Sequence, residues 1–338
     1  MIYTGRGSTA LWAVLQALQM PGGRILVPVN VCEIVVAVIL KAGWRPVFCD
    51  VNPVTGNAGT DEFDAAWSTG IDCVLAVSNF GTPLPMDAVR AWAASKRTTL
   101  IEDVCNALGA THAGQAIGTF GDAAIYSFGY GKIIEHRTGG GLTVQEPGLR
   151  ARVQTIVDAM PVYAERHRET DRVYQERLRA IRASASQQTP DVYGPLYDRY
   201  ADDLWYRIDA EDIVPIEAAR HRLADNLARR RQIGAIYEEG IRHPAVRLRP
   251  RVDGDVFWRF TFTVARSRRQ PLLDAVRAEG LLASTWYPPV AQLFVSGAAT
   301  SEFPGAEEFG ATVVNLFTDY RVDHAAAARA VTVINRLA

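Results

Sequence analysis

One lysine stands where a lysine amine can take part in chemistry. Lys132 ends the run AAIYSFGYGK (123–132), in which an apolar segment predicts a buried strand and the glycines predict a loop. Lys41, Lys96 and Lys132 are the only lysines, so arginine supplies almost all of the basic surface. A desolvated lysine can lose its proton and condense with a carbonyl group as a Schiff base. Taken alone, Lys132 could equally be a solvated loop residue.

A carboxylate follows a second predicted strand. Asp103 comes directly after TTLIE (98–102), a short apolar run of strand type. An aspartate in this place is commonly a helix cap, but it can also pair with the ring nitrogen of a pyridine cofactor. Ligands of parallel sheets bind at the carboxyl ends of the strands, where Asp103 and Lys132 would both lie.

The N-terminal run GRGSTA (5–10) could form an anion site. Its glycines let the backbone approach an anion, and the helix that follows offers free N–H groups, with the Ser8 and Thr9 hydroxyls as further donors. The alternative is a plain helix entry with Ser8 or Thr9 as the N-cap. The Ser127 hydroxyl could also reach a phosphate. A phosphate cradle, an acid at a strand end and a strand followed by Ser and Lys together describe a pyridoxal phosphate (PLP) site.

The first 145 residues alternate between the two kinds of secondary structure. Apolar strands separated by helices predict a mostly parallel sheet with helices on both faces, and therefore an α/β fold. The predicted helices are 9–20, 31–42, 61–67 and 86–95, and the predicted strands are 24–29, 45–50, 72–77, 98–102, 122–128 and 141–144.

The character of the chain changes after about residue 146. The pattern predicts a smaller C-terminal α+β unit behind long, arginine-rich helical stretches. The predicted helical stretches are 148–182 with a break at Pro161, 213–239, 270–279 and 323–337; the predicted strands are 245–248, 257–264, 282–286 and 312–317; and 187–200 is predicted to be an irregular connection.

Composition narrows the class of protein. The chain has 338 residues and a net charge of −1, which gives no electrostatic argument for nucleic acid as a partner. No apolar run is long enough to span a membrane, and the N-terminus lacks the apolar core of a signal peptide. The four cysteines have no metal-ligand spacing, so no metal site is predicted. We expect a cytoplasmic protein.

These motifs occur together in a known family. The chain resembles the DegT/DnrJ/EryC1/StrS family of PLP-dependent aminotransferases, fold-type I enzymes that install amino groups on nucleotide-linked keto sugars and related cyclitols. The resemblance is densest in LIEDVCNALGATHAGQAIGTFGDAAIYSFGYGK (100–132). Further matching segments are GSTAL (7–11), ILVPVNV (25–31), AGWRPVFCDV (42–51), VSNFGTPLPMDAV (77–89), GGGLTV (139–144), RRRQIGAIYEEGI (229–241) and TWYPPV (285–290).

The resemblance implies a fold and a reaction. It implies a large PLP-binding α/β domain over 1–215 and a smaller α+β domain over 216–338. It also implies ping-pong transfer of an amino group from an amino acid, typically glutamate or glutamine, to a small-molecule keto acceptor. Fold-type I enzymes place their active sites at a dimer interface, so a homodimer is implied as well.

The resemblance also implies roles for individual residues. Lys132 would be the Schiff-base lysine and proton shuttle, and Asp103 would bind the pyridinium nitrogen. Asn106 would lie beside the oxygen substituent of the ring. The phosphate would be held by Ser127 and by the backbone groups that follow Gly7, those of Ser8 and Thr9.

The chain departs from the family pattern around the cofactor. Only six residues precede Gly7, where the family has a substantial segment. Cys32 stands where the family places an aromatic ring over the cofactor, so we expect another aromatic there or weaker stacking. The family's Gly-Glu-Gly-Gly is replaced by TGGG (138–141), behind a longer loop. WYR (205–207) is the nearest candidate for the Asn-aromatic-Arg element that a neighbouring subunit sends toward the phosphate.

Three further side chains leave alternatives open. His136 and Arg137, in the loop after the lysine, could contact a substrate or be solvated. Glu33, in an otherwise apolar helix, could be an active-site acid or lie on an exposed side. The departures also leave room for an atypical acceptor, for PLP-dependent elimination, or for a PLP-binding accessory protein that has lost turnover.

Overall fold

The computed structural model describes residues 1–184 and 187–337. Its largest element is a seven-stranded sheet in the order β1-β9-β8-β5-β4-β2-β3, and a four-stranded sheet has the order β10-β11-β13-β12. The strands of the large sheet are β1 (Ile2–Thr4), β2 (Arg24–Pro28), β3 (Arg45–Cys49), β4 (Cys73–Val77), β5 (Thr99–Asp103), β8 (Ala123–Ser127) and β9 (Gly140–Val144). The smaller sheet contains β10 (Arg247–Leu248), β11 (Arg259–Thr263), β12 (Ala283–Ser284) and β13 (Val313–Phe317).

The large sheet is mostly parallel, as the sequence predicts. Strands β3, β2, β4, β5 and β8 run parallel to one another, whereas β9 pairs antiparallel with β8, and β1 pairs antiparallel with β9. The inner strands are apolar on both faces because helices cover both sides.

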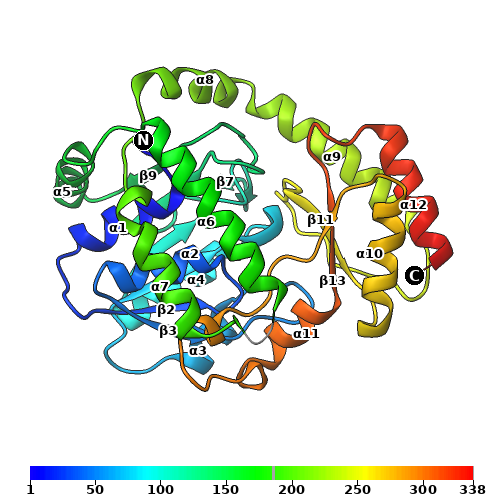
Figure 1. The fold of residues 1–338 in the computed structure, drawn as a ribbon, viewed down its shortest axis with the longest axis horizontal. Helices are drawn as coiled ribbons and strands as arrows, with labels where there is room; N and C mark the ends of the chain where they lie inside the picture. The colour runs from blue at the N-terminus through cyan, green and yellow to red at the C-terminus, as the bar shows by residue number, and fades with distance from the viewer. Residues whose placement is uncertain (185–186, 338) are drawn as a thin grey trace.

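Helices from different parts of the chain cover the two faces of this sheet (Figure 1). One apolar cluster joins α1 (Gly7–Ala17), α2 (Glu33–Lys41), α5 (Pro147–Asp158), α6 (Glu165–Ala183) and α7 (Pro190–Tyr200) to the sheet. The opposite cluster includes residues of α3 (Thr60–Ala66) and α4 (Met86–Lys96). The sheet edge at which Asp103 and Lys132 are predicted to lie therefore belongs to a core that is packed on both faces of the sheet.

The C-terminal part has its own apolar cluster. Residues of α9 (Leu223–Gly240), α10 (Arg266–Ala278) and α12 (His324–Leu337) pack there with β11 and β13. Figure 1 shows α8 (Ala210–His221) and α9 leading from the large sheet to this part. The predicted division at residues 215/216 falls inside α8 and stays a prediction.

The structure differs from the sequence prediction in several places. Residues 190–200, predicted to be irregular, form α7, because Pro190 occupies the first turn, where no N–H is needed, and Tyr193 and Tyr197 bury one face. The single predicted helix over 213–239 is two helices that break at Arg222. Elements not predicted are β1, the hairpin of β6 (Thr111–His112) and β7 (Gln115–Ala116), and α11 (Pro304–Thr312). Within the described residues, no helix is long and apolar enough to cross a bilayer.

Candidate active site

The predicted acid and the predicted phosphate ligand lie at one edge of the large sheet. Asp103 ends β5 and Ser127 ends β8, and the two strands are parallel neighbours in which Asp103 lies opposite Ile125. Lys132 follows β8 in a tight turn, where its backbone N–H donates to the Gly129 carbonyl at 3.2 Å. The three residues are therefore brought to one edge, as the strand pattern predicts.

Asp103 is buried at the end of β5, and its carboxylate lies against Cys105. The residue is only 7% exposed, and Oδ1 accepts the backbone N–H of Cys105 at 2.9 Å. The Cys105 side chain also interacts with this carboxylate. A carboxylate at this strand end is of the type that can pair with a protonated ring nitrogen, which is the role predicted for Asp103.

The first turn of α1 lies against the end of β8. A Cβ added to Gly7 would lie 2.9 Å from Cys105 Sγ and 3.0 Å from Ser127 Cβ, so this contact requires glycine. The helix has no side-chain cap, which leaves its first N–H groups without a side-chain acceptor. The Thr9 hydroxyl donates to the Leu204 carbonyl at 3.3 Å, so Thr9 offers its backbone rather than its hydroxyl.

The Lys132 amine points at Asn106. Nζ donates to Asn106 Oδ1 at 2.8 Å and lies 5.7 Å from the centre of the Trp258 ring. No carboxylate of the described chain forms an ion pair with Lys132. The amine is therefore positioned by an amide oxygen and an aromatic face, beside the buried Asp103 strand end, without a carboxylate partner.

Two aromatic residues of the C-terminal part complete this side of the site. Tyr287 is buried, and its hydroxyl accepts a hydrogen bond from Asn106 Nδ2 at 3.2 Å. Trp258 Nε1 donates to the Gly131 carbonyl at 2.6 Å, and the Trp258 and Tyr287 rings are nearly parallel, 6.3 Å apart. The sequence prediction missed both roles, although TWYPPV (285–290) matched the family and could have pointed to Tyr287.

Cys32 lies at the start of α2, beside a buried ion pair. Its Sγ is 3.8 Å from Glu33 Oε1, and burial, reinforced by Glu33, raises the pKa of Cys32 to about 12, so the thiol is protonated at neutral pH. Glu33 is buried and forms an ion pair with Arg182 of α6. The Arg182 guanidinium lies 4.4 Å from the centre of the Trp286 ring. Glu33 is therefore neither exposed nor unpaired.

Comparison with known proteins agrees with this geometry. Residues 1–189, more than half of the chain, match the DegT/DnrJ/EryC1/StrS aminotransferase family. The chain belongs to this family. A dTDP-4-dehydro-2,3,6-trideoxy-D-glucose 4-aminotransferase of Saccharopolyspora spinosa is 26% identical over 91% of this chain and 76% of its own length. A UDP-N-acetyl-3-dehydro-alpha-D-glucosamine 3-aminotransferase of Acidithiobacillus ferrooxidans is 27% identical over 98% and 82%.

Solved structures of aminotransferases share the fold. TlmJ from Streptoalloteichus hindustanus superimposes with a TM-score of 0.80 at 19% identity, over 99% of this chain and 84% of that one. NtdA from Bacillus subtilis, solved with bound cofactor PMP, gives a TM-score of 0.75 at 16% identity, over 99% and 73%. The predicted fold class, the aminotransferase class and the PLP cofactor are thereby confirmed.

The residues of this aminotransferase fit PLP. Three features match the three polar ends of the cofactor: the buried Asp103 carboxylate, the uncapped start of α1 beside Ser127, and the Lys132 amine, which has no carboxylate partner. Cys32 provides no ring, and the aromatic residues beside Lys132 and Asn106 are Trp258 and Tyr287. The roles of these residues stay predictions.

The loop after the lysine is tied to α8. His136 Nε2 and Arg137 Nε each lie 2.7 Å from Asp212 Oδ1, and Arg137 Nη2 lies 3.1 Å from Oδ2. Although burial opposes it, hydrogen bonds from Arg137 and His136 hold the pKa of Asp212 below its usual value. These contacts give both side chains a structural partner, which the sequence did not indicate.

The run WYR (205–207) is held by its own chain. Trp205 stacks on Trp12 with ring centres 5.4 Å apart, and the Tyr206 hydroxyl accepts a hydrogen bond from Thr138 at 3.2 Å. The Tyr206 carbonyl accepts the Gly5 N–H at 2.8 Å, directly before the first turn of α1. These contacts fix the run against the predicted phosphate-binding end of α1 within the same chain. Its role toward a second subunit stays a prediction.

Proposed function

We propose that this protein moves an amino group from an amino acid to the keto carbon of a sugar, cyclitol or related ketone, with PLP as cofactor. The observation that carries the proposal is the Lys132 amine. It is held by Asn106 without a carboxylate partner, at the sheet edge that also carries Asp103 and Ser127. Bound PLP supplies the carbonyl that accepts the amine and the ring that withdraws electrons.

Each residue at this edge has a task in the proposal. The Asp103 carboxylate would pair with the ring nitrogen and hold it protonated, so that the ring can withdraw electrons. Ser127 and the N–H groups of Ser8 and Thr9 bind the phosphate at the positive end of α1. Lys132 would hold the cofactor, and its amine is the group that would move a proton at the reacting carbon. Asn106 orients Lys132.

The acceptor class rests on the relatives. Those named above act on dTDP- and UDP-linked dehydro sugars, which supports a nucleotide-linked keto sugar as acceptor. Glutamate or glutamine is the proposed donor. A cytoplasmic homodimer with active sites at the interface is proposed on the same resemblance.

The absorbance spectrum of the purified, PLP-treated protein tests the site. We expect a visible band from the lysine-bound cofactor that is present in wild type and absent in Lys132→Ala. Lys41→Ala is the matched control, because Lys41 pairs with Asp198 on the surface at 2.5 Å. If wild type shows no band, or if Lys132→Ala keeps it, the proposal is wrong.

The half-reaction tests the transfer. L-glutamate or L-glutamine should bleach the visible band and release the corresponding 2-oxo acid in a one-to-one ratio with enzyme. A dTDP- or UDP-linked keto sugar should then restore the band and appear as an amino sugar by mass spectrometry. Consumption of the keto sugar with no dependence on any amino donor would instead support elimination.

A further inference from the structure

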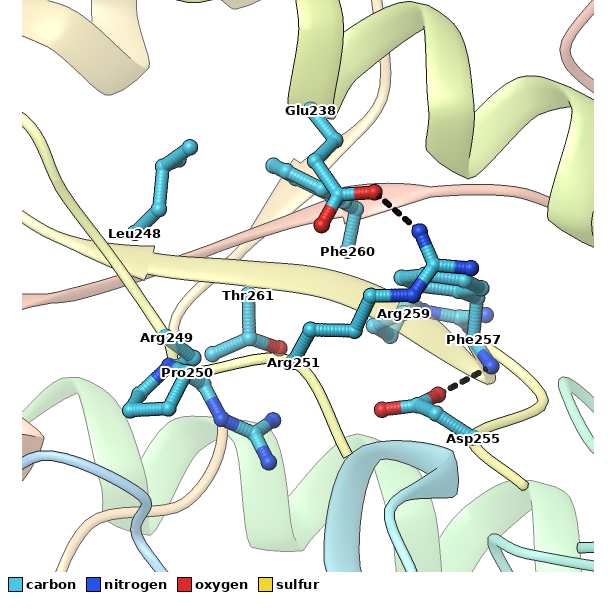
Figure 2. A pocket seen from close by; sticks show the side chains of 10 residues that line it. All are labelled: Glu238, Leu248, Arg249, Pro250, Arg251, Asp255, Phe257, Arg259, Phe260 and Thr261. Atoms are coloured by element: carbon cyan, nitrogen blue, oxygen red, sulfur yellow. Dashed lines mark hydrogen bonds and ion pairs between the residues drawn. The ribbon is translucent and has the colours of Figure 1, made fainter. Parts of the chain in front are cut away.

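A cavity of about 410 Å³ opens beside Lys132. It lies between the loop after the lysine and helices α8 and α9, and its size is that of a small-molecule site. A second cavity, between β10, β11 and the loop before β11 (Figure 2), measures about 30 Å³, little more than the share of one water. Only the first can take a substrate. Its charged lining residues are Lys132, Glu135, Arg222, Asp225, Arg229, Arg230 and Asp319.

Two of the acidic residues in the lining are neutralised from outside the cavity. Asp319 is buried and pairs with Arg259 at 3.2 Å and with Arg321 at 2.7 Å. Glu135 also pairs with Arg321, at 3.4 Å. Because Arg259 and Arg321 do not line the cavity, their charges offset those of the two acids, which then contribute little negative potential to the interior.

The remaining lining charges are mostly positive. Without Lys132, whose amine the cofactor would take up, the lining still has three positive charges, those of Arg222, Arg229 and Arg230. The only negative charge left to balance them is that of Asp225. Arg230 is 2% exposed, and burial, which Asp319 offsets in part, together with the neighbouring guanidinium groups lowers its pKa to about 10. Crowded, desolvated guanidinium groups are stabilised by an anion placed between them.

Two of the arginines retain donors for such an anion. Arg229 lines the cavity and Nη2 donates to the Val322 carbonyl at 2.8 Å, whereas Nη1 has no hydrogen-bond partner and is shielded from solvent, so a ligand would reach it only after a side-chain movement. Arg222, at the break between α8 and α9, is exposed at the mouth of the cavity and forms no ion pair with any described residue. Arg230 differs, because it already donates to Asn226 and to the Trp258 carbonyl. A buried donor without a partner costs free energy that a ligand oxygen recovers.

We propose that this cavity binds an oxyanion group of a substrate through Arg222 and Arg229, while the reacting carbon of that substrate lies at Lys132. The inference rests on the proposed function and adds the recognition site to it. A carboxylate of the amino donor and a phosphate of the acceptor share the required chemistry, since both accept two parallel N–H bonds from a guanidinium group.

The test compares Arg222→Gln and Arg229→Gln with wild type, all loaded with PLP. Arg231→Gln is the matched control, because Arg231 is an exposed arginine next to Arg230 that does not line the cavity. Arg229→Lys retains the charge and should recover part of the loss. Three quantities are measured: the KM for L-glutamate in the half-reaction, the inhibition constant of dTDP against it, and the affinity for pyrophosphate by calorimetry.

The outcomes separate the two sources of the oxyanion. A rise of about 10- to 100-fold in the glutamate KM in the Gln variants, with the visible band unchanged, assigns the site to the donor carboxylate. A comparable rise in the dTDP inhibition constant alone assigns it to the acceptor phosphate. If both constants and the pyrophosphate affinity stay within about twofold of wild type in both variants, the inference is wrong.

The calorimetry also separates this inference from the proposed function. If wild type fails to turn over glutamate but binds pyrophosphate more tightly than Arg229→Gln does, the oxyanion site stands and the proposed function falls. If wild type is active and all variants resemble Arg231→Gln, the proposed function stands and the oxyanion site falls. The phosphate end at α1 is the same in every variant, so it cannot produce a difference.

Discussion

The two sides of Lys132 are built in different ways. On the strand side, Asp103, Asn106 and Ser127 come from two neighbouring parallel strands and the turn after one of them, with the first turn of α1 against them. On the other side, Trp258 and Tyr287 arrive from the C-terminal part, more than 100 residues along the chain. The strand side carries the predicted charge and phosphate donors, whereas the far side supplies aromatic rings and a hydrogen bond from Trp258 to the lysine turn.

This division has a physical basis. Strand ends and helix starts are rigid, and a charged group that must meet the cofactor within a fraction of an ångström belongs on rigid elements. A side that must admit substrates and release products can be assembled from a separate part of the chain. We therefore expect substitutions on the strand side to affect chemistry most, and those on the far side to affect positioning and stability.

The largest expected effect is on the strand side. Asp103→Asn should lower kcat about 100- to 1,000-fold, because the amide cannot hold the ring nitrogen protonated. The melting temperature should hardly change. Steady-state kinetics and thermal unfolding measure the two effects.

The adjacent carboxylate is the matched control for that prediction. Glu102 accepts N–H groups from Gly118, Phe120 and Gly121 at 2.6–2.7 Å. Glu102→Gln should lower the free energy of unfolding by about 3 kcal/mol, because it weakens these buried hydrogen bonds. The kcat of the enzyme that remains folded should be close to that of wild type. If Asp103→Asn and Glu102→Gln change kcat and stability to the same extent, Asp103 has no special role in the reaction and the strand side is only structural.

The next effect concerns the buried ion pair between α6 and the start of α2. Arg182→Met leaves Glu33 buried without its partner and should lower the unfolding free energy by about 3 kcal/mol. Adding Glu33→Gln should recover part of this loss, which urea unfolding of the single and double variants measures. Arg172→Met, on the exposed face of α6, should hardly change stability. Equal losses for the Arg182 and Arg172 variants would show that the buried pair with Glu33 adds no more stability than a surface pair.

A smaller effect is expected from the hydrogen bond on the lysine turn. Trp258→Phe keeps the ring but loses the N–H bond to Gly131, so kcat should fall about tenfold, the equivalent of about 1.4 kcal/mol, with binding of PLP retained. Trp67→Phe is the control, since Trp67 packs on Trp92 in another region. An unchanged kcat and an unchanged visible band in Trp258→Phe would show that the lysine turn does not depend on the hydrogen bond from Trp258.

The smallest effect depends on pH. The folded-state pKa of Asp212 is lowered, so its contribution is complete above the unfolded value of about 3.9 and is lost as the pH falls through the folded value. Asp212→Asn should therefore be about 1 kcal/mol less stable than wild type at pH 7, and the two should converge below pH 4. A gap that widens in acid would contradict the Asp212 contacts with His136 and Arg137.

Local patterns were sufficient for the strand side. Apolar runs of strand length separated by helices determined a mostly parallel sheet, and parallel strands bring their carboxyl ends to one edge. For that reason Asp103, Ser127 and Lys132 could be placed together from their positions in the sequence alone. Gly7 could be placed with them because a glycine at a helix start permits a close approach.

The far side was decided only by the tertiary structure. Nothing local in FWRF (257–260) indicates that Trp258 will reach the lysine turn, and nothing in an arginine-rich helix indicates which guanidinium will pair with Glu33. Residues 190–200 have the prolines of a loop, yet buried tyrosines make them helical. Such contacts depend on how remote segments pack, and a pattern of a few residues carries no information about that packing. The sequence determined which residues stand at the strand ends, and the packing of the chain decided what holds them in place.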